Sequence, residues 1–353
     1  MIGTIILCGN PVPVQLYSEF LRERTFRWPL KSAAKRGLVV YAERLENKNL
    51  PVILDMQHLS WHTGIKSQFI ANVVLDGARY YRSKVIPKRR GGERILFVPR
   101  PFLAGLQRWI LDEALSKLKP HCSAFGFIKG RGIVENAKVH VNSKCIVKVD
   151  IKDFFGSVSY VTVYDIFLQA GYSPKISYFL SNICTLNDAL PQGAPTSPAL
   201  SNMAMFQADT QIAEFCSQNA LLFTRYADDI CLSGDLIPES AFPFLSDCLA
   251  KFGYEVAEDK TVLAFAGQKK IVTGISISSG KLKLPKEQRR KLRQAIHYIS
   301  KHGINSHLAN LAILDPIYRY RLAGQIDFWL SIEPDNEVAK LGRRIIRSTI
   351  SAG

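Results

Sequence analysis

The chain has 353 residues, of which 46 are Lys or Arg and 30 are Asp or Glu, so its formal net charge is +16. Hydrophobic residues make up 47% and charged residues 22%, proportions that exclude a disordered tail, a fibrous repeat and a low-complexity array. A single hydrophobic core stops growing at roughly 250 to 300 residues, so two or three subdomains are expected. The basic excess favours a polyanionic partner, with nucleic acid preferred over an anionic membrane surface.

The start of the chain and the cysteines indicate the compartment. The apolar stretch at 5–8 is far shorter than the roughly 20 residues of a spanning helix, and it has no basic flank or cleavage site. We therefore expect no signal peptide and no membrane partner. The seven cysteines are scattered and include no CxxC pair, which disfavours structural zinc and disulfides and fits reduced thiols in a cytoplasm.

The first hundred residues predict two helices and a basic hairpin. The helices are expected at 16–24 and 33–46. Because Gly91 and Gly92 favour a turn, two short strands are expected at 81–86 and 94–98. The alternative is a solvated basic loop. The segment lies ahead of the motifs described below, and this position favours the hairpin. Its basic residues are Arg82, Lys84, Lys88, Arg89, Arg90, Arg94 and Arg100.

A core helix and several shorter elements follow. Apolar residues recur at helical spacing from Leu103 through Leu106, Ile110 and Ala114 to Leu118, and the helix ends before Pro120. After a basic, Gly-rich turn at 126–132, helices are expected at 136–140, 160–170, 174–184 and about 199–220. Strands are expected at 145–151, 221–225 and 230–233, and a loop rich in Pro and Gly at 190–198.

Three carboxylates lie at the ends of predicted strands. Asp150 is near the end of one strand, and Asp228 and Asp229 occupy the tip of a hairpin. Such an acid pair is more often an exposed turn or a helix cap. Between hydrophobic strands, however, like charges repel unless a cation neutralises them, and Mg²⁺ suits oxygen ligands while keeping positions for water and phosphates. Two ions roughly 3.5 to 4 Å apart can activate a hydroxyl and stabilise a leaving oxygen in phosphoryl transfer.

The ordered motifs resemble one enzyme family. DIKDFF at 150–155, LPQGAPTSP at 190–198 and YADD at 226–229 look like the palm of a reverse transcriptase. NAKVH at 136–140 resembles the NAxxH element of retron reverse transcriptases, and VTG at 272–274 their VTG triplet. The resemblance runs from about residue 80 to the C-terminus, whereas residues 1 to about 50 do not align with the family.

The resemblance implies roles for individual residues. The implied metal set is Asp150, Ile151, Asp228 and Asp229, holding two Mg²⁺ ions, and the three aspartates are the catalytic residues. The residues implied for the incoming deoxynucleotide are Arg94, Asp153, Phe154, Phe155, Gln192, Gly193 and Lys260, with Lys88 or Arg90 assisting from the hairpin. Among them, Phe155 is the aromatic gate against a ribose 2′-OH, and Lys260 assists the pyrophosphate leaving group. Those implied for RNA are Asn136, His140, Val272, Thr273, Gly274, Arg289, Arg290 and Arg293.

Several of these residues have a structural alternative. One or both of Phe154 and Phe155 can be core residues. His140, four residues after Asn136, can satisfy a buried polar contact, and Tyr226 can pack beneath the turn. The 272–274 triplet can be an ordinary strand end with a turn glycine.

A second basic segment lies towards the C-terminus. Between 281 and 301 eight Lys and Arg residues face one acid, Glu287. Leu292, Ile296 and Ile299 give this helix an apolar side, which leaves the basic side for a nucleic-acid backbone. It resembles a thumb helix that follows a template–primer duplex, whose A-form presents shape and phosphates more than base edges. Lys340, Arg343, Arg344 and Arg347 extend the basic surface.

The expected fold is α+β, a right-hand polymerase with fingers, palm and thumb, an RRM-like antiparallel palm sheet and a helical thumb. Its expected divisions are an N-terminal helical extension at 1–60, fingers with part of the palm at 61–145, palm at 146–270 and thumb at 271–353.

The family implies an RNA-directed DNA polymerase that copies a cognate structured noncoding RNA, used as template and as primer, into a branched RNA–DNA product. Its implied setting is the bacterial cytoplasm, in antiphage defence with a separate effector protein. Alternatives are a defence-associated or group II intron reverse transcriptase, a catalytically silent RNA-binding scaffold, and a nucleotide cyclase palm. The last is disfavoured because cyclases lack the LPQG loop and a basic thumb.

Overall fold

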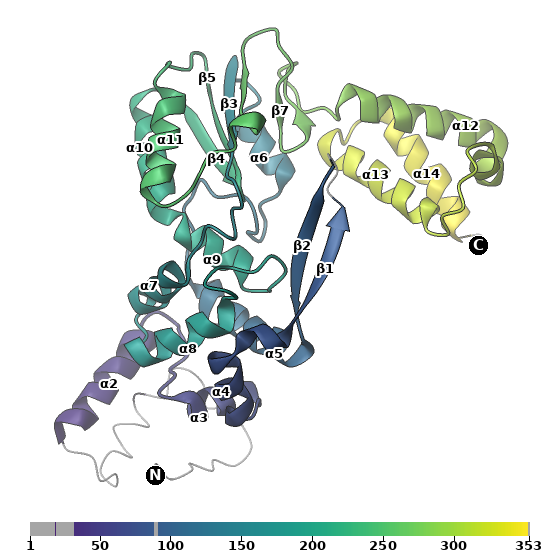
Figure 1. Ribbon diagram of the computed structural model, residues 1–353. Coiled ribbons are helices and arrows are strands. Elements are labelled where there is room, and N and C mark those ends of the chain that lie inside the picture. Colours follow the sequence, from purple (N-terminus) through teal and green to yellow (C-terminus); the bar gives the residue numbers. More distant parts are fainter. Residues whose placement is uncertain (1–17, 19–31, 88–90, 352–353) are drawn as a thin grey trace. The chain divides into compact units, whose positions relative to one another are not determined.

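The computed structural model describes residue 18 and residues 32–87 and 91–351, and the chain forms two compact units (Figure 1). Unit 1 comprises the described residues of Met1–Cys122, with Lys152–Thr210 and Leu249–Glu255. Unit 2 comprises Ser123–Ile151, Gln211–Cys248 and Val256–Gly353, again as far as they are described. The predicted helix at 16–24, the assisting residues Lys88 and Arg90, and Cys8 lie outside the described residues, apart from Ser18.

Unit 1 is mostly helical. Its helices are α2 (Ser32–Glu46), α3 (Met56–Thr63), α4 (Ser67–Leu75), η3 (Gly77–Tyr80), α5 (Pro101–Trp109), η4 (Ile110–Ala114), η5 (Leu115–Lys117), α7 (Tyr160–Ala170), α8 (Pro174–Cys184) and α9 (Ser197–Ala204). Its two strands, β1 (Tyr81–Pro87) and β2 (Glu93–Pro99), form the predicted basic hairpin. Helices α10 (Phe206–Gln218) and α11 (Ala241–Lys251) run from one unit into the other.

Two helices differ from their predicted extent. The helix that begins at α5 was expected to run to Leu118, but η4 is a π-helix, and the wider turn shifts the register so that Leu115 is buried and Leu118 is only half-buried. The single helix expected at 199–220 is two helices, α9 and α10. The buried Met205 between them has φ −78° and ψ −7°, away from the α-helical ψ of about −42°.

Unit 2 contains a four-stranded antiparallel sheet and a helical C-terminal part. The sheet order is β4 (Leu222–Tyr226), β5 (Asp229–Gly234), β3 (Cys145–Asp150) and β6 (Val262–Ala264). Of these four strands, β3 comes first in the sequence, and it lies between β5 and β6, the last two. This is a split βαβ arrangement. This confirms the predicted α+β class and the RRM-like palm sheet. The proposed boundaries of fingers, palm and thumb stay a prediction.

The rest of unit 2 packs into one apolar core with the sheet. Helix α6 (Ile133–Val139) precedes β3, and the small hairpin of β7 (Ile271–Val272) and β8 (Ile275–Ser276) leads to α12 (Lys286–Asn310), α13 (Tyr318–Ile332) and α14 (Glu337–Ser351). Buried residues from Ile146 in β3 to Trp329 in α13 belong to this core. The predicted apolar side of the basic helix is confirmed, since Leu292, Ile296 and Ile299 of α12 are buried in it. Within the described residues, no helix is both long and apolar enough to cross a membrane.

Candidate active site

The register of the palm sheet brings the three predicted carboxylates to one edge. In the β3–β5 ladder Asp150 is directly opposite Asp229. Asp228 occupies the turn between β4 and β5, and its carbonyl oxygen accepts a 3.0 Å hydrogen bond from the Ile151 amide. Ile151 itself is buried. The structure thus brings the predicted metal set together through two strand ends that are about 80 residues apart in sequence.

Buried backbone and side-chain contacts fix the turn that carries Asp228. Ala227 has a left-handed φ of 57°, and the fully buried Arg225 donates a 3.1 Å hydrogen bond from Nη1 to the Ala227 carbonyl. The Arg225 amide donates to Ser123 and its carbonyl accepts from Phe125, each at 2.8 Å. The segment at 123–126 therefore lies along β4. Arg225 was not predicted, although a charged residue inside a predicted strand was a signal.

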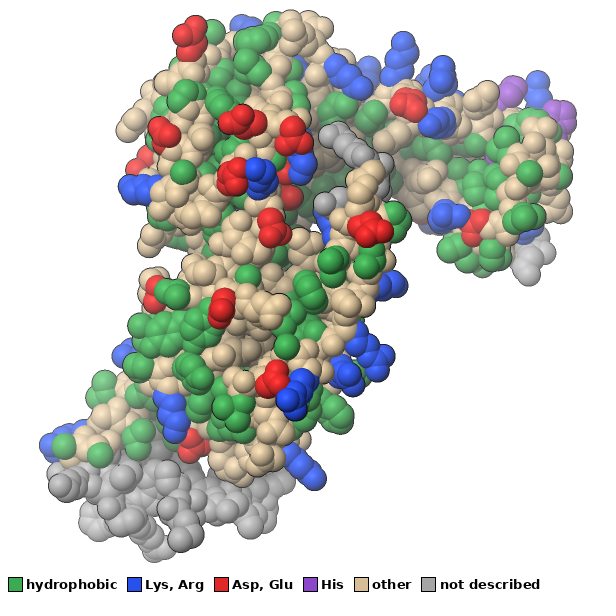
Figure 2. All heavy atoms as spheres, viewed as in Figure 1, with side chains coloured by type: hydrophobic (Ala, Val, Ile, Leu, Met, Phe, Trp, Pro, Cys, Tyr) green, Lys and Arg blue, Asp and Glu red, His purple; other side chains and the backbone are tan. Residues whose placement is uncertain are grey.

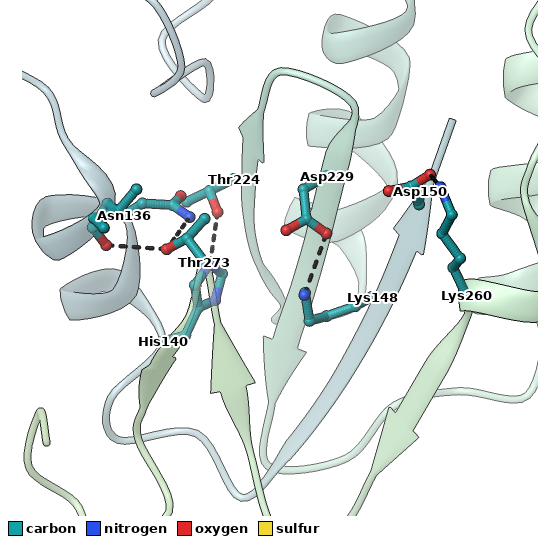
Figure 3. A network of polar contacts seen from close by, with 9 residues as sticks. Asn136, His140, Lys148, Asp150, Thr224, Asp229, Lys260 and Thr273 are labelled. Carbon is teal, nitrogen blue, oxygen red and sulfur yellow. Dashed lines mark hydrogen bonds and ion pairs between the residues drawn. The ribbon is translucent and has the colours of Figure 1, made fainter. Parts of the chain in front are cut away.

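Two lysines neutralise two of the carboxylates (Figure 3). Lys260 Nζ lies 2.5 Å from Asp150 Oδ1, and Lys148 Nζ lies 3.2 Å from Asp229 Oδ1. Lys260, in the short helix η6 (Glu258–Lys260), is predicted to serve the pyrophosphate, and in this structure it contacts a predicted metal ligand. The hydrogen bond to Asp150 raises the pKa of Lys260. Lys148 was not predicted, although its spacing of two residues from Asp150 places both side chains on one face of the strand.

Asp228 forms no ion pair among the described residues, and its environment is unfavourable for a charge. Burial raises the pKa of the Asp228 carboxyl, and the neighbouring Asp150 and Asp229 carboxylates raise it further. A bound cation relieves both effects, because it replaces lost hydration and cancels the repulsion.

The donors at this edge fit a divalent cation only after a rearrangement. Among the described residues, no three His, Cys, Asp or Glu side chains are placed to hold a metal ion as they stand. The carboxylate oxygens and the Ile151 backbone are nevertheless the oxygen donors that Mg²⁺ prefers. Lys260 Nζ contacts one of these donors, Asp150 Oδ1, from the exposed helix η6.

The predicted nucleotide-binding residues of unit 1 form two local groups. In the first, Asp153 has a left-handed φ of 39°, and this conformation turns Phe154 into the core while Phe155 stays half-buried. The structure thus bears out the expectation that at least one of the two aromatics is core. Phe154 also lies 5.4 Å from Phe155 between ring centroids.

The second group ties the Gln192–Gly193 turn to the basic hairpin. The Phe97 amide of β2 donates a 2.7 Å hydrogen bond to the Gln192 carbonyl. Gly193 has φ 122°, and a Cβ there would lie 2.9 Å from the Phe97 carbonyl oxygen, so only glycine fits. The exposed Arg94 lies on the same strand, opposite Ile86. The alternation of the strands puts Arg82, Lys84 and Arg94 on one face of the hairpin.

The NAxxH residues at 136–140 and the VTG residues at 272–274 contact one another and the palm sheet in unit 2, and we call this contact the buried joint. His140 is fully buried, and its ring nitrogens lie 2.6 Å from Ser233 Oγ and 2.7 Å from Thr224 Oγ1. Asn136 Nδ2 donates to Thr273 Oγ1 at 3.4 Å (Figure 3).

Three of the predicted RNA-binding residues are buried in this joint, and their role in RNA binding stays a prediction. His140, Val272 and Asn136 have exposed fractions of 0%, 0% and 1%, so their side chains are not open to RNA in this structure. Thr273 is half-buried and Gly274 is exposed, and their role in RNA binding remains a prediction.

The buried imidazole of His140 predicts a pH dependence of stability. Burial, assisted by the charge of Lys148, lowers the pKa of His140 from 6.5 to about 4. Between these values the unfolded chain binds a proton that the folded chain does not. The free energy of unfolding should therefore fall as the pH drops from about 6.5 to about 4, by up to about 3 kcal/mol from this group.

Urea unfolding across that pH range checks the prediction. His140→Asn should show a shallower pH dependence than the parent chain, whereas the exposed His297→Asn should retain the parent slope. His58, whose pKa burial lowers to about 3, contributes in the same direction in every variant. An unchanged slope in His140→Asn would contradict the assignment.

The predicted basic surface of the thumb lies on α12. Arg290 is exposed and lies opposite the buried apolar side of the helix, and Arg293 is exposed on its flank. Arg289 is half-buried, because it lies seven residues before Ile296, on the same side of the helix as the buried residues. Figure 2 shows Lys and Arg side chains gathered over this helix. The helix is not continuous, since Gly303 with φ 78° and ψ 164° breaks it.

Comparison with known proteins gives a consistent family. A family model described as reverse transcriptase (RNA-dependent DNA polymerase) matches residues 86–298. The chain is 32% identical over 260 residues to the retron Ec86 reverse transcriptase of Escherichia coli, with 72% of this chain and 81% of that protein covered. It is 30% identical over 325 residues to the retron Mx65 reverse transcriptase of Myxococcus xanthus, with 81% and 76% covered.

Among solved structures, the telomerase of Candida albicans with a fragment of telomeric RNA aligns with a TM-score of 0.43 and 12% identity. The alignment covers 76% of this chain and 63% of the telomerase chain, so this chain spans less than two thirds of that length. The extent of the family match and the coverage of the retron relatives identify the chain as a member of the reverse transcriptase family, a retron-type RNA-directed DNA polymerase.

Proposed function

We propose that this polymerase copies a cognate structured RNA into DNA at the palm edge, using two Mg²⁺ ions. The observation that supports the proposal most directly is the meeting of Asp150, Asp228 and Asp229 at one edge of the sheet, where burial and then like charges raise the pKa of Asp228. Asp150 and Asp228 would hold the ions, with the Ile151 backbone beside them and Asp229 completing the cluster. The ions would activate the attacking hydroxyl and stabilise the leaving oxygen.

The chain's own residues then orient the substrates. Arg94, on the cationic face of the hairpin, binds the triphosphate, because a guanidinium matches phosphate oxygens with two parallel donors. Gln192 and Gly193 lie against the nascent base pair. Lys260, once it leaves Asp150, is a cation free to accompany the pyrophosphate. Arg289, Arg290 and Arg293 contact the phosphates of the template–primer duplex, which is a sequence-independent mode of binding.

Phe155 supplies the selection of deoxynucleotides. An aromatic face beneath the sugar leaves no room for a 2′-OH, so Phe155→Ala should raise the relative incorporation of ribonucleotides by roughly tenfold or more. Competition assays with paired rNTP and dNTP substrates measure this ratio. Phe167→Leu, a change in a fully buried ring of α7, is the control and should leave the ratio near that of the parent. Unchanged discrimination in Phe155→Ala removes this residue as the gate.

The retron relatives support a more specific biological proposal. The RNA serves as primer through an internal guanosine 2′-OH as well as template, so the product is DNA branched from RNA. The complex acts in the bacterial cytoplasm, in antiphage defence with a separate effector protein. Purifying the chain from its host and sequencing the nucleic acid that accompanies it tests the proposal. DNA joined to RNA supports it, whereas RNA without DNA favours the silent scaffold, and unbranched DNA favours another bacterial reverse transcriptase.

A further inference from the structure

Two lysines form ion pairs with carboxylates at the palm edge, and the side chain of Lys148 is less exposed than that of Lys260. Of the six residues of β3, only Lys148 and Asp150 are not buried, and their side chains lie on the same face of the strand. The Lys148 side chain is only 18% exposed and that of Asp229 only 30%. A charge so far removed from water costs free energy unless a partner compensates it, and the partner here is Asp229 Oδ1 at 3.2 Å.

The strand register explains why this lysine is needed. Asp150 and Asp229 are direct partners in the β3–β5 ladder, and like charges in that relation destabilise a sheet. Lys148 pairs with Cys231, two residues along β5 from Asp229. That diagonal lies within the reach of a lysine side chain. Lys148 therefore offsets the repulsion from inside the sheet.

The two lysines at this edge differ in how firmly they are held. Lys260 comes from the short helix η6 and is 48% exposed, so its ammonium group has room to leave Asp150. Lys148 comes from a strand paired on both sides, with β5 and β6, and is enclosed. A cation can therefore take the place of Lys260 more readily than that of Lys148.

We propose that Lys148 is a positioning residue for the polymerase reaction. It acts as a fixed counter-charge that holds Asp229 in place and leaves Asp150 and Asp228 as the carboxylates open to divalent ions. The inference rests on the proposed function, and it adds a division of roles among the three aspartates. Its consequence is that Lys148 limits the affinity of the site for a cation while keeping the geometry productive.

Direct binding of Mn²⁺ to the full chain without nucleic acid tests the proposal, with free Mn²⁺ followed by electron paramagnetic resonance. Lys148→Met makes the cluster more negative by one charge, so Mn²⁺ should bind roughly threefold tighter or more. Turnover in primer extension should nevertheless fall, by roughly tenfold or more, because Asp229 is no longer held in position. Tighter binding with slower turnover is a combination that general damage to the fold does not produce.

Three further variants complete the test. Lys148→Gln repeats the charge removal in case Lys148→Met does not fold. Lys148→Met with Asp229→Asn restores the net charge and should return Mn²⁺ affinity close to that of the parent. Lys144→Met is the matched control, because Lys144 forms an exposed pair with Asp235, at 3.4 Å, just before the same strand. It should change neither Mn²⁺ binding nor turnover.

The outcomes separate this proposal from the proposed function. Unchanged or weaker Mn²⁺ binding in both Lys148 variants overturns the role of Lys148 alone. If the parent chain binds Mn²⁺ no better than the double variant Asp150→Asn with Asp228→Asn, the metal assignment fails, and the role of Lys148 fails with it.

Discussion

Asp228→Asn is expected to abolish Mg²⁺-dependent incorporation of dNTPs, with a loss of roughly a thousandfold or more. Asp228 lies in the β4–β5 turn beside Asp150 and Asp229, and its burial raises its pKa, as do these two carboxylates. An amide keeps the shape of the side chain but removes the charge that a divalent ion requires. Primer extension on an RNA template measures the loss, and filter binding of RNA should remain within roughly twofold of the parent, because the basic groups of α12 are untouched.

A matched control lies on the same stretch of chain. Asp235 follows β5, and its side chain is 76% exposed in a pair with Lys144. Asp235→Asn removes the same charge from the protein without touching the palm edge, so it should extend primers at the parent rate. Undiminished synthesis by Asp228→Asn would refute the two-ion mechanism at this edge, and equal losses in both variants would show that net charge, not the site, is responsible.

The local elements could be predicted because their signals are local. The Gly91–Gly92 pair indicated the hairpin, and the paired strands β1 and β2 confirm it. Short apolar runs that end at Asp150 and at the Asp228–Asp229 turn indicated three strands of the palm sheet. These patterns depend on backbone periodicity and on turn residues, which neighbouring residues determine.

The partners of the site residues could not be predicted, because they depend on register and burial. The period of two places Lys148 on the face of Asp150, but only the pairing with β5 brings it to Asp229. His140 was expected among the RNA contacts, yet α6 packs on the sheet so that its ring reaches Thr224 and Ser233. The π-turn at Ile110–Ala114 likewise has no signal in the spacing of the apolar residues that precede it.

The site combines a frame of buried contacts with one lysine contact from an exposed segment. Arg225 and the segment at 123–126 hold the turn, and Lys148 holds Asp229 from within the sheet. Lys260 contributes the only lysine contact to these carboxylates, among the described residues, that comes from an exposed turn. Lys260 Nζ thus contacts Asp150 Oδ1, while the hydrogen bonds of Arg225 and of residues 123 and 125 fix the turn beside it.

Gly126→Ala should show how strongly turnover depends on the position of the turn that carries Asp228. A Cβ at residue 126 would lie 2.6 Å from the Ala227 amide nitrogen, nearer than real Cβ atoms approach backbone. Neither side can yield easily, because the Ala227 carbonyl is held by Arg225 and residues 123 and 125 are bonded to β4. The turn should shift, and with it the adjacent Asp228. A displacement of about 1 Å at a catalytic group lowers the rate by roughly a hundredfold.

The cost in stability should be smaller than the cost in rate, since overpacking of one methyl group typically destabilises by about 1–3 kcal/mol. Single-turnover primer extension and urea unfolding, measured on the same preparation, separate the two effects. Gly324→Ala is the control, because Gly324 lies inside α13 of the same unit and no atom lies within 4 Å of its added Cβ. That change should leave the rate unaltered and add up to about 1 kcal/mol of helix stability. Parent-like turnover by a folded Gly126→Ala variant would mean that the turn tolerates displacement, and that the contacts of Arg225 serve stability without aligning Asp228.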